Sequence, residues 1–149
     1  MTQVHDDGTL VQKDKVSTKM EDIAAERLKK HFKWDKLERL AGLNDIDYYA
    51  EKLDRHVANL EIKGCKYDHG KYTYAVFSQR KWLALALVQA EAGTRGILSS
   101  IYMDGKLFYV WIDGMGPVFT HVIERKGRGL KNDREPMFHV QLKYMTEVK

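Results

Sequence analysis

The sequence has little cysteine, little proline and no long hydrophobic run. Cys65 is the single cysteine among 149 residues, so no disulfide can form within the chain and no cysteine-based metal cluster can be built. No apolar stretch reaches the length of a membrane span, and the polar N-terminus lacks the apolar core of a signal peptide. We therefore expect a cytoplasmic protein that does not associate with membranes.

The composition is that of a folded protein. Hydrophobic residues make up 44% of the chain and charged residues 31%, a balance that argues against disorder as the main state. Residues 1–17 are polar and aperiodic, which predicts a flexible tail, and residues 18–149 are predicted to form a single α+β domain. The net charge of +4 is compatible with a polyanionic partner.

Hydrophobic periodicity predicts helices in the N-terminal part of the domain. Apolar residues recur at helical intervals over residues 19–32, 34–41 and 44–60. A further helix is predicted over residues 78–92, where Ser78 is suited to cap its start and Gly93 its end. This helix is apolar on nearly every face, so we expect it to be buried at the centre of the domain.

Strand patterns dominate the rest of the chain. Residues 61–67 and 71–77 alternate with period two around a turn, which predicts a β-hairpin. After the central helix, Asp104-Gly105 is a typical hairpin turn. The predicted strands of this region cover residues 97–103, 107–112, 118–124 and 137–145. Four successive strands predict a C-terminal antiparallel β-meander.

One interpretation of the charged residues is a metal-dependent nuclease. Asp113, Glu124 and Lys126 have the residue types of a P-D-(D/E)-x-K nuclease, in which carboxylates hold a divalent metal beside a lysine. Two features speak against it. Asp113 precedes a glycine, as turn residues often do, and the segment after Lys126 contains two glycines and a proline, which disfavour the helix expected there.

Two histidines suggest another enzyme, a phosphoesterase that uses acid–base chemistry. His121 and His139 lie on predicted strands, but neither is followed two residues later by the Ser or Thr that such a pattern requires. His139 alternates with apolar neighbours, which favours a solvated strand face instead.

A third interpretation is nucleic-acid binding. Arg80 and Lys81 stand at a predicted helix start beside Trp82, where cations can contact phosphate and the indole can stack on a base or pack in the core. A second group of cations lies in the loop of residues 125–134. Glycines separate several of these cations and allow close backbone approach to a partner. The predicted binding residues are Arg80, Lys81, Arg125, Lys126, Arg128, Lys131 and Arg134. A solvated surface loop is the alternative for the last five.

The order of these segments resembles the RecT family of phage single-strand annealing proteins over about residues 45–149. The similar segments are NLEIKG, GCKYDHGKYTYAVF, SQRKWLALAL, ILSSIYMDGKLFYVWI, VFTHVIERKG and NDREPMFHVQLKY. The chain lacks the glycine of the family's helix start and is truncated relative to the family. The resemblance implies contact of Arg80, Lys81, Lys126, Arg128 and Arg134 with DNA, a homo-oligomer, and a phage protein in a bacterial host cell.

Taken together, these patterns favour a non-catalytic protein that binds and anneals single-stranded DNA in phage-type homologous recombination, with no metal and no cofactor. Two alternatives remain open. One is the nuclease with Asp113, Glu124 and Lys126, and the other is a phage structural or inhibitor protein that binds another protein through a sheet edge or a helix stripe.

Overall fold

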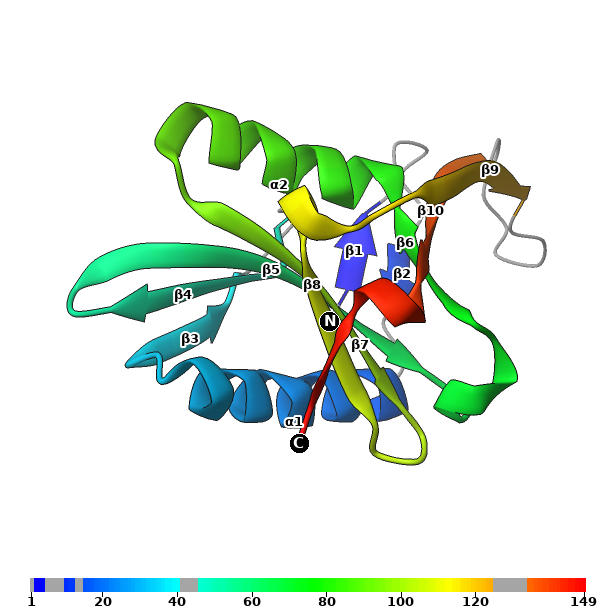
Figure 1. Ribbon diagram of the computed structural model, residues 1–149, viewed down its shortest axis with the longest axis horizontal. Coiled ribbons are helices and arrows are strands. Elements are labelled where there is room, and N and C mark those ends of the chain that lie inside the picture. Colours follow the sequence, from blue (N-terminus) through cyan, green and yellow to red (C-terminus); the bar gives the residue numbers. More distant parts are fainter. Residues whose placement is uncertain (1, 5–9, 13–14, 41–45, 125–133) are drawn as a thin grey trace.

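A computed structural model describes residues 2–4, 10–12, 15–40, 46–124 and 134–149. At its centre lies a six-stranded sheet with the order β11-β8-β7-β5-β4-β3. Its strands are β3 (Lys36–Arg39), β4 (Tyr48–Lys52), β5 (Arg55–Cys65), β7 (Arg95–Tyr102), β8 (Leu107–Trp111) and β11 (Thr146–Val148). The helices α1 (Lys15–Phe32) and α2 (Gln79–Ala92) cover opposite faces of this sheet (Figure 1). The α+β class is therefore confirmed.

The sheet is mixed because the chain crosses it once. β3, β4 and β5 follow one another as antiparallel neighbours. β7 then pairs with β5 in parallel, and the connection between them contains α2. Parallel neighbours need such a crossover, since a tight turn can join only antiparallel strands. β8 and β11 extend the sheet beyond β7 as antiparallel strands.

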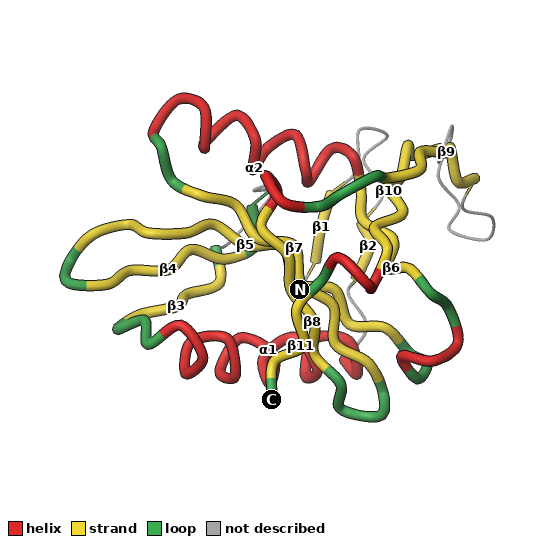
Figure 2. The backbone as a smooth tube through the Cα atoms, viewed as in Figure 1, coloured by secondary structure: helices red, strands yellow, loops and turns green. Residues whose placement is uncertain are grey.

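A second sheet of three strands lies beside the first (Figure 2). Its order is β6-β10-β9, and all its pairings are antiparallel. The strands are β6 (Tyr74–Ser78), β9 (Val118–Glu124) and β10 (Arg134–Gln141). Among the described residues, the 3-10 turns η1 (His69–Lys71), η2 (Ile112–Gly114) and η3 (Leu142–Tyr144) each lie between a strand of one sheet and a strand of the other. β6 runs directly into α2, so the second sheet meets the first at the start of that helix.

Each face of the central sheet has its own hydrophobic core. The core on the α1 side includes Ala24, Leu28, Ala50, Leu60, Ile62, Ile97 and Ile101. The core on the α2 side includes Phe77, Leu85, Leu98, Val110, Phe138 and Val140. Because strand side chains alternate between faces, Leu60 and Ile62 on the α1 side place Glu61 and Lys63 on the α2 side. Two charged side chains of β5 thus point toward α2.

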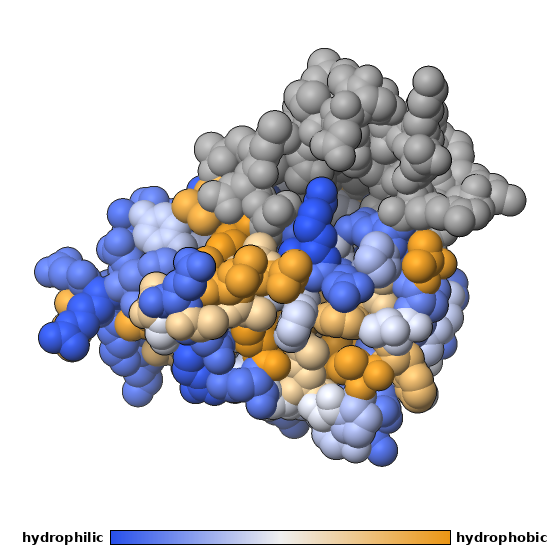
Figure 3. All heavy atoms as spheres, turned by 90° about the horizontal axis from the view of Figure 1, so that it is seen from above, coloured by the Kyte–Doolittle hydropathy of each residue, from blue (hydrophilic) through white to orange (hydrophobic). Residues whose placement is uncertain are grey.

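The expectation of a buried central helix is wrong. α2 has the predicted ends, with a Ser78 N-cap and Gly93 in the left-handed conformation, but it lies on the outside of the sheet. Lys81 and Leu85 are its buried residues, whereas Leu83 and Leu87 are about half exposed. Hydrophobic side chains lie among hydrophilic ones on this side of the molecule (Figure 3). An apolar composition therefore did not mean burial here.

The helices predicted over residues 34–41 and 44–60 are wrong, since these segments form β3, β4 and the first half of β5. A two-residue turn joins β4 to β5, and both of its residues, Leu53 and Asp54, have positive φ. Such turns usually contain Asn or Gly. Leu-Asp carries no such signal, so the apolar spacing fitted one long helix.

The predicted hairpin and meander also differ from the structure. β5 pairs with β4 and β7, whereas β6 pairs with β10, so residues 61–67 and 71–77 do not form a hairpin. Of the four strands assigned to one meander, β7 and β8 belong to the central sheet and β9 and β10 to the second sheet. The strands were predicted at about the right places in the sequence, but they pair with other strands than predicted.

Near the N-terminus, β1 (Thr2–Val4) and β2 (Leu10–Gln12) form a short antiparallel pair, and α1 begins at Lys15, before the predicted start. The division into a flexible tail and one domain stays a prediction. Neither helix of the described chain has both the length and the apolar character needed to cross a bilayer.

Candidate active site

Two acidic residues of neighbouring strands face the α2 side of the sheet. Glu61 lies on β5, and Asp47 lies just before β4. The register of these antiparallel strands pairs Tyr48 with Leu60. Extending it by one residue places Asp47 opposite Glu61. Directly opposed strand residues are close enough for their side chains to act together.

Lys63 follows Glu61 at the spacing Glu-x-Lys, so both side chains lie on the same face of β5. The Nζ atom of Lys63 donates a hydrogen bond of 2.7 Å to the carbonyl oxygen of Val76 on β6. This bond ties the lysine to the second sheet. The site therefore lies where the two sheets meet.

A second lysine completes the group. Lys81, in the first turn of α2, places its Nζ 2.7 Å from Oδ1 of Asp47 and 3.8 Å from Oε2 of Glu61. The side chains of Lys81 and Asp47 are each 10% exposed, and that of Glu61 is 15% exposed. We call Asp47, Glu61, Lys63 and Lys81 the carboxylate–lysine cluster.

The charge of Lys81 is set by two opposing effects. Burial lowers the pKa of the ammonium, but attraction by Glu61 and Asp47 and the hydrogen bond to Asp47 raise it by more, so the pKa of Lys81 lies above its ordinary value. Lys81 is therefore a cation at neutral pH. A buried cation between two carboxylates compensates charges that would be costly to bury alone.

Ser78 fixes the direction from which Lys81 enters the cluster. Its hydroxyl oxygen accepts a hydrogen bond from the backbone N–H of Lys81 and so caps α2. The same hydroxyl donates to a carboxylate oxygen of Glu135 on β10. The cap thus links the helix start to the second sheet and holds the first turn of α2 beside the acidic residues.

Two histidines of the second sheet lie near Lys63. His139 pairs across the sheet with Val76, and its Nε2 is 3.4 Å from Nε2 of His121. Burial lowers the pKa of His139, and the nearby His121 and Lys63 lower it further. His139 also packs against the ring of Tyr74. The solvated strand face predicted for His139 is thus half buried and close to the cluster.

The cluster has the donors that a divalent metal requires. Mg²⁺ is usually held by one or two protein carboxylates together with water and substrate phosphate. Asp47 and Glu61 supply two carboxylates, both beside the same Nζ atom of Lys81. Among the described residues, no group of three or more His, Cys, Asp or Glu is suited to a metal. The two residues fit a metal with an open coordination sphere.

The two described residues of the predicted nuclease trio, Asp113 and Glu124, are not part of the carboxylate–lysine cluster. Asp113, in η2, accepts a hydrogen bond of 3.1 Å from Arg95, and both side chains are about half exposed. Glu124 is the last residue of β9, and Lys126 lies outside the described residues. The structure does not test these three as metal ligands. Their roles stay a prediction, as does the alternative of a phage protein that binds another protein.

Most of the predicted nucleic-acid-binding residues also remain untested. Arg80 is exposed at the start of α2, and Arg134 begins β10. Lys81 is buried in the carboxylate–lysine cluster rather than presented to solvent. The loop cations Arg125, Lys126, Arg128 and Lys131 lie outside the described residues. Trp82 packs edge-on against Phe138, 5.2 Å between ring centres, which is the core-packing alternative.

Sequence reasoning missed this cluster although a signal was present. Glu61-Ile62-Lys63 has the same Glu-x-Lys spacing that Glu124 and Lys126 have. This segment lies on an apolar strand, but the helix predicted for Asp47 concealed that Asp47 is close to Glu61.

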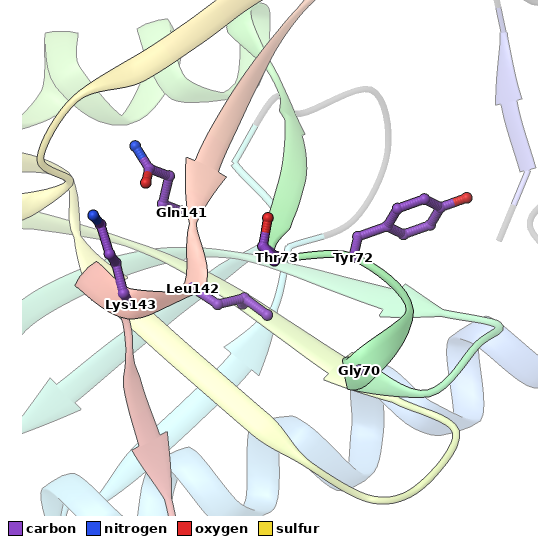
Figure 4. Close-up of a pocket in the computed structure, with 6 residues that line it drawn as sticks. All are labelled: Gly70, Tyr72, Thr73, Gln141, Leu142 and Lys143. Atoms are coloured by element: carbon purple, nitrogen blue, oxygen red, sulfur yellow. The ribbon is translucent and has the colours of Figure 1, made fainter.

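A separate hollow is lined by Gly70, Tyr72, Thr73, Gln141, Leu142 and Lys143 (Figure 4). It includes no residue of the cluster.

Comparison with known proteins corrects the family assignment. No family model matches the sequence, and no curated protein matches it. The structure is similar to Hjc of Archaeoglobus fulgidus, a Holliday junction resolvase from an archaeal hyperthermophile, with a TM-score of 0.55 and 12% identity over 85% of this chain and 89% of that chain. The resemblance to the RecT family, and with it the prediction of single-strand annealing, is therefore wrong, and the fold of this chain is similar to that of the archaeal protein.

Proposed function

We propose that this protein is a metal-dependent DNA nuclease of the P-D-(D/E)-x-K type, with its active site at the carboxylate–lysine cluster. The observation that carries the proposal is the position of Asp47 opposite Glu61, with Lys63 two residues further along the same strand. The fold shared with a Holliday junction resolvase supports it. The substrate class proposed is DNA, and a four-way junction is the first structure to test.

In this proposal, Asp47 and Glu61 hold the metal. When bound, a divalent ion of this kind activates a water molecule and stabilises charge on the phosphate. Lys63 carries a cation on the same strand face as Glu61, and its hydrogen bond to Val76 restricts where that cation can lie. A positioned cation stabilises the extra negative charge that develops on a phosphate in the transition state.

The DNA contacts proposed outside the cluster are electrostatic. Arg80 is exposed at the start of α2, next in sequence to a cluster residue. Positive side chains and helix N-termini bind phosphate without reading sequence. The predicted loop cations Arg125, Lys126, Arg128, Lys131 and Arg134 remain part of the proposal as backbone contacts for DNA.

Cleavage of labelled DNA tests the proposed function. A four-way junction, a duplex and a single strand are each incubated with the protein in Mg²⁺ or in EDTA. We expect Mg²⁺-dependent cleavage that is lost in Asp47→Asn and in Glu61→Gln. Cleavage should be kept in Asp113→Asn, because Asp113 pairs with Arg95 at the surface. Cleavage that survives Asp47→Asn would contradict an active site at the cluster. Cleavage that is lost in Asp113→Asn alone would favour the predicted site with Asp113, Glu124 and Lys126.

A further inference from the structure

We infer that Lys81 is a built-in competitor of the divalent metal: its ammonium fills the cation position between Asp47 and Glu61 and must leave when a metal binds. This inference rests on the proposed function. It assigns to Lys81 a role different from that of Lys63, whose Nζ donates a hydrogen bond to the backbone carbonyl oxygen of Val76.

The first reason is space. A divalent metal held by carboxylates lies about 2.0 to 2.6 Å from the oxygens. The Nζ atom of Lys81 is 2.7 Å from Oδ1 of Asp47 and 3.8 Å from Oε2 of Glu61. An ion bound to both carboxylates would occupy nearly the same volume as this ammonium. The two cations therefore exclude each other.

The second reason is charge. The three side chains are at most 15% exposed, so water screens them little. A metal and an ammonium a few ångströms apart would repel strongly in such a site. Without a metal, the ion pairs with Asp47 and Glu61 hold the ammonium of Lys81 in place. Metal binding thus has to break an ion pair before it gains its own contacts.

The third reason is that Lys81 has somewhere to go. Its ammonium is carried on a flexible four-carbon stem, which allows a large displacement without a backbone change. The residue belongs to the first turn of α2, where Arg80 is exposed. An ammonium displaced toward this helix start would stand beside Arg80 and face solvent, where a phosphate can bind it.

Calorimetric titration with Ca²⁺ separates competition from a purely structural role. The full chain is compared with Lys81→Met, which keeps an unbranched side chain of nearly the same length without the charge, and with Lys52→Met, which removes an exposed lysine at the end of β4. We expect Lys81→Met to bind Ca²⁺ at least about tenfold more tightly than the unaltered protein, because no ion pair has to be broken. Lys52→Met should bind like the unaltered protein, and Asp47→Asn should bind little.

The outcomes distinguish the inference from the proposed function. Equal or weaker Ca²⁺ binding by Lys81→Met, with clear binding by the unaltered protein, overturns competition and leaves the nuclease proposal standing. Binding by Lys81→Met alone supports competition but contradicts metal dependence of the unaltered protein. No binding by any variant overturns both. If Lys81→Met does not fold, Lys81→Gln removes the charge while keeping a donor for Asp47, and the same expectations apply.

Discussion

At the scale of single residues, Asp47 and Asp113 show how differently two ion-paired aspartates are placed. Asp47 is 9% exposed and contacts a lysine that is equally buried, whereas the side chains of Asp113 and Arg95 are about half exposed. Removing one member of a buried pair leaves the other charge buried without a counter-charge. Exposed pairs are screened by solvent and contribute little.

We therefore expect Asp47→Asn to lower the free energy of unfolding by about 3 kcal/mol, because Lys81 loses its nearest carboxylate. Asp113→Asn, the matched control, should change it by less than about 1 kcal/mol. Urea denaturation followed by circular dichroism measures both. Equal losses in the two variants would show that the Asp47–Lys81 pair contributes no more than a surface pair.

His139 is expected to make the stability of the fold depend on pH. Its pKa in the folded protein is lowered from the ordinary 6.5, first by burial and then by His121 and Lys63. The unfolded chain therefore takes up a proton at this residue more readily than the folded chain, so the stabilisation is present above pH 6.5 and is lost as the pH falls below it. We expect the thermal midpoint to fall between pH 7.5 and 5.5, and to fall less in His139→Gln. Identical pH profiles for the two proteins would exclude His139 as a source.

At the scale of elements, α2 has a well-defined inner face despite its overall apolar sequence. Leu85 is 1% exposed and packs in the core on the α2 side, whereas Leu87 is 52% exposed. The two leucines belong to the same helix and differ only in the face they occupy. They allow the packing of α2 to be tested with one kind of substitution.

Leu85→Asp should unfold the domain or lower its stability by more than about 3 kcal/mol, because a carboxylate would replace a fully buried leucine. Leu87→Asp should change stability by less than about 1 kcal/mol, since the new charge would face solvent. Thermal melting compares the variants. A Leu85→Asp variant that melts with the unaltered protein would show that α2 is not packed as described.

The sequence predicted those elements whose ends carry local signals. Ser78 and Gly93 marked α2, and the Asp104-Gly105 turn marked the hairpin of β7 and β8. β4 and β5 were missed because their alternating apolar residues also fit a helical stripe and because the turn at Leu53-Asp54 has neither Asn nor Gly. The candidate site depends on the pairing of those two strands, so it could not be located before they were recognised.

At the scale of the whole molecule, the cluster joins parts that are distant in sequence. Its residues come from the segment before β4, from β5 and from α2, and hydrogen bonds from Lys63 and Ser78 attach it to β6 and β10 of the second sheet. Long-range pairing of this kind is not encoded by local propensity. The assembly of two sheets around one helix start was therefore beyond what sequence patterns alone predict.

DNA affinity should depend on salt in proportion to the number of phosphates contacted. If Arg125, Arg128 and Lys131 each contact a phosphate, changing all three to Ala should flatten the salt slope of duplex binding by about three units. Fluorescence anisotropy at several salt concentrations, in EDTA to prevent cleavage, measures the slope. Lys52→Ala, which removes an exposed lysine at the end of β4, serves as the control. An unchanged slope in the triple variant would identify the loop as a solvated surface.

The parallel pairing of β5 with β7 leads us to expect a time order for folding. The ion pair between Asp47 and Lys81 spans 34 residues, and its helix docks only when the crossover from β5 to β7 has closed. Contacts so far apart in sequence form late, because the loop between them must first lose its conformational freedom. We therefore expect Asp47 and Glu61 to come together on neighbouring strands before Lys81 reaches them. On this expectation, the acidic pair meets its cation late in folding.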